Sequence, residues 1–417
     1  MENNKIDYLL VGIVIALTGF EIAFRASILI QLGVLICIAV YFFWIGKRFS
    51  NVFFIIVTPL ILAIFLQAIF FQNIYLFIAN SIAIMVKFLT CYMVLEIVKN
   101  RFNKTFVGFI YFLAIFSLIF YPTQFFPGIQ DTIKNGIGSL IKPIGSANIP
   151  PWLVSKTLIF FTYHHGHGFE IVGEYRNCGA FWEPGVFAIF LNIALLINLF
   201  INKTALFSLK NVVFIIAEIT TFSTTGFIVL FLIIISSLIL NKKIELVLLY
   251  IPLLITILLL SYTFVWKLDF MSEKISDQAN NASYSRSSRF GAALYHFEEL
   301  KESPLTGVSL GVAEREKDQR FEDRIVTPNG ISIIFFVWGI PVGLLYYIFF
   351  YMGLSRWLRF HRIDNRLIHF LFFFIFILSA FSQDLTNRHF YFMILFFVAC
   401  FPRNPIPIPI VLKNKNK

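Results

Sequence analysis

The sequence predicts an all-α polytopic membrane protein with about twelve transmembrane helices. Of its 417 residues, 58% are hydrophobic and 53 are Phe, which gives more apolar surface than a soluble chain of this length buries. Apolar runs of about 18 or more residues recur along the chain, and this length crosses a bilayer as a helix. The runs are continuous and lack the alternation of polar and apolar residues that a membrane β-barrel requires.

Twelve apolar segments are expected to cross the membrane, so that both ends of the chain lie on one side. Two of them, 211–222 and 226–240, are short for complete crossings and meet at the sequence TTFSTTGF. Its Gly and hydroxyl side chains suit either a break between two crossings or a re-entrant turn inside the protein. The segments lie near residues 7–24, 27–46, 52–71, 74–98, 105–122, 184–202, 211–222, 226–240, 244–265, 329–354, 367–382 and 389–402.

The charged residues indicate how the helices are oriented. The net charge is +11, and the loops on the side of the two termini carry many more Lys and Arg than Asp and Glu. Short loops rich in Lys and Arg stay on the cytoplasmic side of a membrane. The positive charge therefore reports orientation, and it gives no reason to expect a nucleic-acid partner.

Two long loops on the opposite, outer side divide the chain into five parts. Each loop holds roughly 60 residues, far more than neighbouring helices need for a connection, and such loops are often functional. Turn sequences such as PTQFFPG and IPPW predict ordered structure within them. The parts are N-terminal transmembrane helices (1–120), a first large loop (121–183), central transmembrane helices (184–265), a second large loop (266–328), and C-terminal transmembrane helices with an inner tail (329–417).

An amphipathic helix is predicted within the second loop, at about 287–301, because apolar residues recur there at helical spacing. Arg286 and Arg289 lie at its start, where positive charge opposes the helix dipole. This local cost points to an anionic partner at the helix N-terminus. An ion pair with Glu298 or Asp323 would also offset it.

The sixth predicted crossing begins on the outer side with Glu183 and Pro184. Pro suits the first helical turn because its missing N–H costs nothing there, which places Glu183 at the N-cap. Free N–H groups at a helix N-terminus bind anions, and Arg176 lies a short distance upstream. The stretch predicts a phosphate site beside a carboxylate that positions a hydroxyl group or accepts its proton. Alternatively, Glu183 only caps the helix and pairs with Arg176.

No metal or cofactor site is expected. His164, His165 and His167 lie together in the first loop, but only Glu170 is near them in the sequence to complete a ligand set. The chain also has no P-loop, GxSxG or GxGxxG motif. This absence argues against ATP-driven transport and serine hydrolysis.

Two ionisable residues, Lys87 and Glu218, lie within predicted crossings. Buried ions in a membrane need partners or a water-filled cavity. We expect the two to pair with each other, and a transport route through the membrane is the alternative.

Several motifs resemble those of the O-antigen polymerase and O-antigen ligase superfamily. They are R-x-x-G-x-F-x-E-P-G-x-F-A at 176–188, S-T-T-G at 223–226, S-R with P-L-T-G-V-S-L-G at 288–311, P-N-G-I at 328–331, and the following W-G-I-P-V-G. Their order and the two large outer loops match from about 121 to 345. The resemblance implies a glycosyltransferase with a GT-C-like fold in the bacterial inner membrane, with its active face in the periplasm.

The resemblance also implies a substrate, an oligosaccharide linked to undecaprenyl diphosphate and presented from membrane lipid. The lipid diphosphate is an activated leaving group, so no cofactor is required. Arg176, Arg286 and Arg289 are suited to bind the diphosphate, because guanidinium groups match phosphate oxygens. Glu183 is the expected base or hydroxyl-orienting group. The remaining substrate-binding candidates are His296, which is also a weaker candidate base, Arg324 and Asn329.

Ligases of this superfamily carry a His-Asn pair where this chain has Pro328-Asn329, which favours the polymerase (Wzy-type) branch. A ligase and a lipid-linked oligosaccharide transporter are the alternatives. A transporter predicts polar residues along many helices, whereas this chain concentrates them in the two outer loops. The sugars, the linkage, the choice between O-antigen and capsule, and the need for a polysaccharide chain-length regulator as partner are left open.

Overall fold

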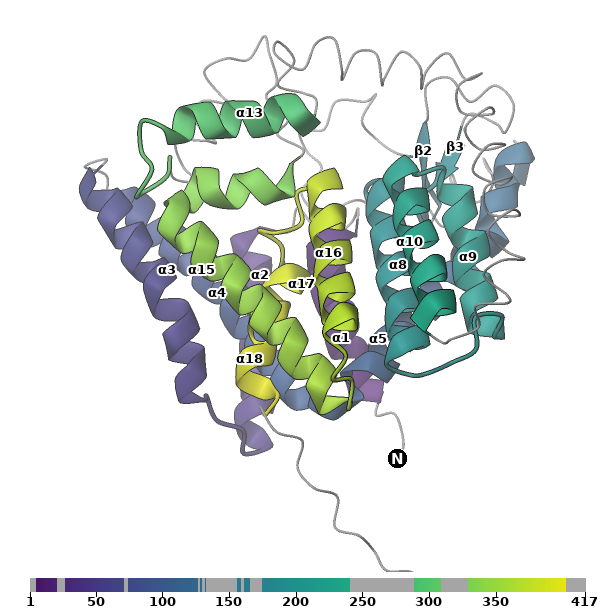
Figure 1. Cartoon of the computed structure of the whole chain (residues 1–417), viewed down its shortest axis with the longest axis horizontal. Coiled ribbons are helices and arrows are strands. Elements are labelled where there is room, and N and C mark those ends of the chain that lie inside the picture. Colours follow the sequence, from purple (N-terminus) through teal and green to yellow (C-terminus); the bar gives the residue numbers. More distant parts are fainter. Residues whose placement is uncertain are drawn as a thin grey trace, which may run out of the picture.

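The computed structural model shows helices packed side by side in a bundle, with the loops gathered at its two ends (Figure 1). It describes residues 5–20, 27–70, 74–126, 128–129, 132, 156–158, 161–165, 175–240, 289–308 and 329–402.

The N-terminal helices follow the predicted crossings. They are α1 (Lys5–Gly19), α2 (Ile28–Trp44), α3 (Asn51–Phe70), α4 (Ile74–Val98) and α5 (Phe102–Phe120), with short 3-10 turns η1 (Lys99–Arg101) and η2 (Tyr121–Phe125) on either side of α5.

The rest of the chain continues the same pattern. Every predicted crossing within the described residues coincides with a helix, and the predicted crossing at 244–265 lies outside them. The last crossing differs from the prediction because it is divided in two. These helices are α8 (Pro184–Phe200), α9 (Leu209–Thr221), α10 (Thr224–Leu240), α13 (Arg289–Leu300), α15 (Gly330–Phe360), α16 (Arg366–Ser382), α17 (His389–Leu395) and α18 (Phe397–Cys400).

The helices have the length and surface of membrane-embedded segments. Three stretches of the described chain, 51–70, 78–123 and 330–360, are long and apolar enough to cross a membrane, and four shorter apolar helices accompany them. The stretch 78–123 contains a turn at Lys99, whose φ is 36°. Large apolar side chains cover the outside, with Trp44 81% and Leu29 75% exposed. Such a surface suits lipid, so the chain is a helical membrane protein.

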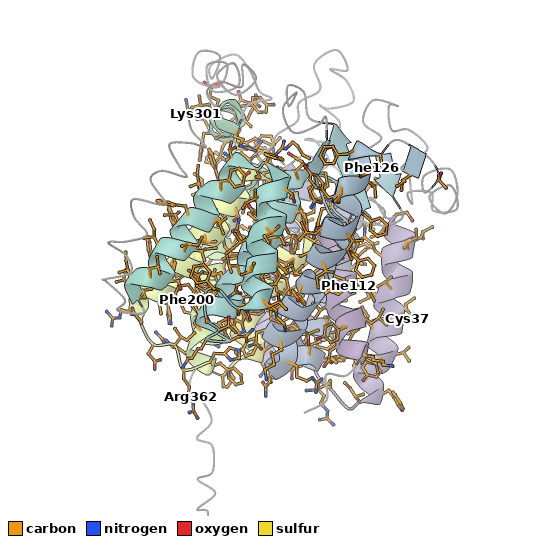
Figure 2. The ribbon with its side chains drawn as sticks, turned by 90° about the vertical axis from the view of Figure 1, so that its right-hand side faces the viewer. Cys37, Phe112, Phe126, Phe200, Lys301 and Arg362 are labelled. Carbon is orange, nitrogen blue, oxygen red and sulfur yellow. The ribbon has the colours of Figure 1, made fainter. Side chains whose placement is uncertain are left out.

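Loops from the two predicted sides of the membrane lie at opposite ends of the bundle. Figure 2 shows Arg362 at one end, and Phe126 and Lys301 at the other. At the Arg362 end, Lys47 Nζ lies 3.2 Å from Glu96 Oε1 across the α2–α3 and α4–α5 turns. We call this the inner end, and the end that carries α13 the outer end (Figure 1).

A small sheet at the outer end is a feature that the sequence did not predict. Its strands are β1 (Lys156–Leu158), β2 (Phe161–His165) and β3 (Tyr175–Asn177), paired antiparallel in the order β1-β2-β3. His164 pairs with Arg176 in the register of β2 and β3. The strands lie above α8, α9 and α10 (Figure 1), and β3 leads directly into the start of α8.

The short segments α9 and α10 are two separate helices of 13 and 17 residues that meet at a turn at the outer end. α8 runs from the outer end to the inner end, and α9 returns after the 201–208 loop. Phe222 between α9 and α10 has a left-handed conformation (φ 47°), and its carbonyl contacts Arg176 at the outer end. The turn therefore lies beneath β3, with Thr221 and Ser223 buried, and α10 begins directly after it.

A kink in α15 fixes the amphipathic helix to the bundle. Gly339 has φ 77° and Gly307 has φ 69°, a region that favours Gly, and their backbones touch. Gln67 of α3 donates from Nε2 to the carbonyls of Thr306 (2.5 Å) and Val337 (2.6 Å). These contacts tie the segment after α13 onto the bend of α15. The P-L-T-G and W-G-I-P motifs thus have a structural role.

Gly339→Ala is expected to destabilise the protein by about 2 kcal/mol, because the added Cβ meets the Leu305 backbone and the left-handed φ disfavours Ala. Thermal unfolding in detergent measures the change. Gly33→Ala on α2 is the matched control, since a Cβ there meets no atom within 4 Å. Equal melting temperatures for the two variants would contradict this role of Gly339.

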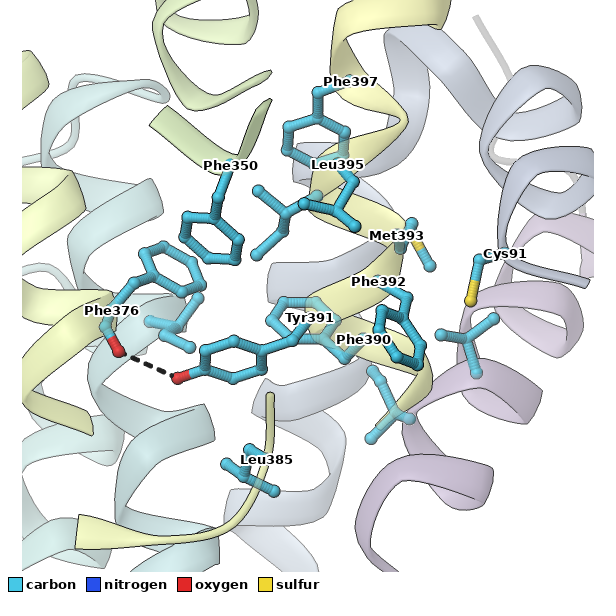
Figure 3. Packing of buried hydrophobic residues seen from close by; sticks show 14 of the residues in the cluster. Cys91, Phe350, Phe376, Leu385, Phe390, Tyr391, Phe392, Met393, Leu395 and Phe397 are labelled. Carbon is cyan, nitrogen blue, oxygen red and sulfur yellow. Dashed lines mark hydrogen bonds between the residues drawn. The ribbon is translucent and has the colours of Figure 1, made fainter. Parts of the chain in front are cut away.

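Aromatic rings fill the centre of the bundle (Figure 3). Phe350 of α15 stacks on Tyr391 of α17, with ring centroids 5.7 Å apart. The Tyr391 hydroxyl donates a hydrogen bond to the Phe376 carbonyl of α16 at 3.1 Å. A buried phenol needs such a partner, so this bond permits a Tyr in an otherwise apolar interior.

Candidate functional site

Glu183 is the N-cap residue of α8, as predicted, but its side chain does not cap the helix. Its φ and ψ of −148° and 144° are extended, and Pro184 is the first helical residue. The Glu183 carbonyl accepts from Val186 N–H (3.1 Å) and Phe187 N–H (3.3 Å). The carboxylate makes no capping hydrogen bond and, in the described part of the chain, no ion pair. The Glu183 side chain therefore neither caps α8 nor forms a direct ion pair with Arg176, and the two remain close enough to interact electrostatically.

Arg176 on β3 is anchored to the turn between α9 and α10. Its Nε donates to the Thr221 carbonyl at 3.0 Å, and Nη2 donates to the Phe222 carbonyl at 2.8 Å. Burial lowers the pKa of Arg176, whereas nearby Glu183 raises it and nearby Arg289 lowers it further. Glu183 and Arg289 are thus close enough to act electrostatically on Arg176.

Arg289 is the first residue of α13 and reaches the end of α16. Its Nε donates to the Ser382 carbonyl at 3.0 Å. Burial lowers the pKa of Arg289, and the Glu183 carboxylate raises it. The same carboxylate therefore acts on both arginines.

Arg176, Glu183 and Arg289 thus lie within electrostatic range of one another at the outer end without forming direct ion pairs, although they come from two outer loops far apart in the sequence. Two guanidinium groups against one carboxylate leave a positive charge among these three side chains. Arg289 uses only Nε in hydrogen bonds to described residues, so the donors of its two terminal nitrogens remain for another acceptor. A partly buried site of this kind attracts anions.

Asn177, next to Arg176, fixes β3 and was not a candidate in the sequence. Its Nδ2 donates to Ser117 Oγ of α5 (3.1 Å) and to Thr220 Oγ1 of α9 (2.9 Å). Its Oδ1 accepts from Gly179 N–H at 2.9 Å. A buried amide with all these partners holds the Arg176 backbone in place. Nothing in the sequence around Asn177 distinguishes it from a loop asparagine.

Asn329 supports Arg289. It is the N-cap of α15, where Oδ1 accepts from Ile331 N–H (2.9 Å) and Ser332 N–H (3.1 Å). Its Nδ2 donates to the Arg289 carbonyl at 3.1 Å. Asn329 is 1% exposed, and its bond to the Arg289 carbonyl positions the start of α13.

His296 is held between α13 and α15. Its Nδ1 lies 2.7 Å from Ser332 Oγ, and its ring stacks on Phe336 with centroids 4.5 Å apart. The ring is 1% exposed. His296 therefore packs in the interface between α13 and α15, on the side of α13 that faces the bundle.

The expected pair between Lys87 and Glu218 does not form. Asn192 Nδ2 of α8 donates to Glu218 Oε1 (3.2 Å), whereas Lys87 Nζ donates to the Asn387 carbonyl (3.3 Å). The two side chains belong to different parts of the bundle. The prediction was wrong because the sequence gives the depth of a residue in the membrane and not the helix that it faces.

Arg286 and Arg324 lie outside the described residues, as do the side chains of the His164 cluster. Among the residues that the structure does describe, no three His, Cys, Asp or Glu side chains gather in a way that could hold a metal ion.

Comparison of the chain with protein-family models, with curated proteins and with solved structures finds no match. Function is therefore inferred from the site. An arginine pair can bind a phosphate or diphosphate, and the adjacent carboxylate can accept a proton from a hydroxyl group. The site lies at the end of a membrane bundle, where lipid headgroups and their attached groups are found.

Proposed function

We propose that this protein is a membrane glycosyltransferase that polymerises oligosaccharide repeat units linked to undecaprenyl diphosphate into a surface polysaccharide. The observation that supports it is that Arg176 and Arg289 both lie within electrostatic range of Glu183 at the outer end. Together with the motif resemblance, this favours a GT-C-like enzyme of the bacterial inner membrane whose active face is periplasmic.

The reaction assigns a role to each group. The acceptor hydroxyl oxygen attacks the anomeric carbon of the donor sugar, and the bond from that carbon to the lipid diphosphate breaks. Glu183 takes the hydroxyl proton, while the diphosphate leaves with the bonding electron pair and is stabilised by Arg176 and Arg289. No nucleotide or metal enters this scheme, since the leaving group is already activated.

Apolar side chains near Arg176 suit the lipid tail of such a donor. Tyr121 of η2 acts on the pKa of Arg176, so η2 lies close to the guanidinium. Ile119 (61%) at the end of α5, Phe125 (54%) in η2 and Phe126 (57%) directly after it are exposed. A polyprenyl chain in the bilayer could contact them while its diphosphate reaches the arginines.

Two other functions fit less well. A ligase moves finished glycan to a lipid acceptor and uses the same donor, but Pro328-Asn329 lacks the histidine of the ligase motif. A transporter needs polar groups along its route, and Glu218 and Lys87 are instead bonded within the bundle.

The purified protein should remain active in excess EDTA, because the proposed charge stabilisation comes from arginines. The measurement is the initial rate of glycan elongation before and after chelation. Loss of activity that one divalent ion restores would contradict this expectation and direct attention to the His164 segment.

Incubation of purified protein with an undecaprenyl-diphosphate oligosaccharide, followed by gel electrophoresis, tests the function. We expect a ladder of products spaced by one repeat unit. Transfer to an added lipid acceptor would indicate a ligase, and unchanged substrate would contradict both enzymes.

A further inference from the structure

The segment 383–388, which links α16 to α17, borders the site. Ser382 just before it accepts the hydrogen bond from Arg289. Arg388 lies over the Trp182 ring, 5.7 Å from its centroid, next to Glu183. The segment therefore adjoins both the Arg289 side and the Glu183 side of the site. Gln383 is its first residue and is 6% exposed.

The Gln383 amide lies beside Glu183 at the first turn of α8. Its Nε2 is 2.9 Å from the point that a Cβ on Gly185 would occupy, and Glu183 Oε1 is 3.8 Å from the same point. The amide and the carboxylate thus both lie close to Gly185. A side chain at Gly185 would therefore displace the Gln383 amide.

Neither of these polar groups is satisfied by the described protein. Hydrogen bonds to described residues account for neither the Gln383 amide nor the Glu183 carboxylate, although a primary amide offers two donors and an acceptor. The Gln383 amide atoms are not among the fully buried unpaired polar atoms of the described chain, so a ligand can reach them and form hydrogen bonds with them. A neutral amide matches hydroxyl groups, whereas the charged arginines match phosphate.

We propose that Gln383 binds a sugar hydroxyl group of the substrate and holds the glycan against Glu183. This inference rests on the proposed function and divides its site into two halves. Arg176 and Arg289 bind the diphosphate, and Gln383 with Glu183 binds the sugar. A site that hydrogen-bonds a hydroxyl group rejects ligands that lack it, so Gln383 contributes to recognition of the glycan.

The test compares two lipids bound to the full-length protein in nanodiscs, by native mass spectrometry. One is undecaprenyl diphosphate, and the other is the same lipid carrying the oligosaccharide. Gln383→Leu should weaken binding of the glycan lipid about tenfold, the value of one or two lost hydrogen bonds, and leave the bare lipid unchanged. Gln31→Leu on α2 makes the same chemical change outside the site and should alter neither affinity.

The outcomes distinguish a failure of the proposed role of Gln383 from a failure of the proposed glycosyltransferase function. Equal weakening of both lipids, or no weakening of either, would overturn the role of Gln383 while the wild-type preference for the glycan lipid stands. If the wild-type protein binds the glycan lipid no better than the bare lipid, the proposed sugar site at Gln383 and Glu183 is wrong. That result would also count against the proposed function. If Gln383→Leu does not fold, Gln383→Asn, which keeps the amide but shortens it, should show the same selective loss.

Discussion

Arg176→Ala and Arg289→Ala are each expected to lower the rate of glycan elongation by about 100-fold or more, because each removes a charged donor to the leaving diphosphate. The two guanidinium groups are held by different backbone carbonyls, so we expect each to contact the diphosphate from its own position. The measurement is the initial rate of ladder formation by purified protein. Arg176→Lys and Arg289→Lys should recover only part of the rate, since Lys keeps the charge and loses the planar fork.

The control for these variants is Arg362→Ala, which removes one exposed positive charge at the inner end (Figure 2). It should retain full activity. Arg176 also bonds to the carbonyls of Thr221 and Phe222, so its variants require a melting temperature to show that the α9–α10 turn is intact. Wild-type rates in a folded Arg176→Ala or Arg289→Ala protein would remove that arginine from the site.

Glu183→Gln is expected to lower turnover by about 100-fold or more while binding of undecaprenyl diphosphate is retained or strengthened. The amide cannot accept the hydroxyl proton, and its neutrality removes repulsion of the diphosphate. Stability should not change, because the Glu183 carboxylate makes no hydrogen bond or ion pair with described residues. Turnover and lipid affinity, measured separately, distinguish the two effects.

Glu302→Gln near α13 provides a matched loss of one exposed carboxylate at the outer end and should leave turnover unchanged. If Glu183→Gln lowers the melting temperature without a selective effect on turnover, Glu183 has a structural role and is not the base.

The helical architecture could be predicted from the sequence because apolar runs of sufficient length have only one stable form in a membrane. The amphipathic helix was also predicted, at about 287–301, and the structure places it at Arg289–Leu300. Glu183 and Arg289 could be predicted as site residues because each is a charged residue at the start of a predicted helix. Local sequence signals were sufficient for these features.

Contacts between segments distant in the sequence could not be predicted. The sheet β1–β3 consists of strands too short to show a pattern. Nothing in the local sequence marks Gln383 or Asn177 as a site residue. Both reach the site only because the folded chain brings the end of α16 and β3 close together. The pairing of Lys87 with Glu218 failed for the same reason, since a helix pattern does not specify which neighbour a side chain meets.

The most direct measurement is a structure of the protein in nanodiscs with bound undecaprenyl diphosphate. We expect phosphate oxygens within hydrogen-bond distance of both Arg176 and Arg289, about 2.7–3.2 Å, with the first phosphate beside Glu183. A diphosphate bound elsewhere, or one that contacts neither arginine, would contradict the proposed active site.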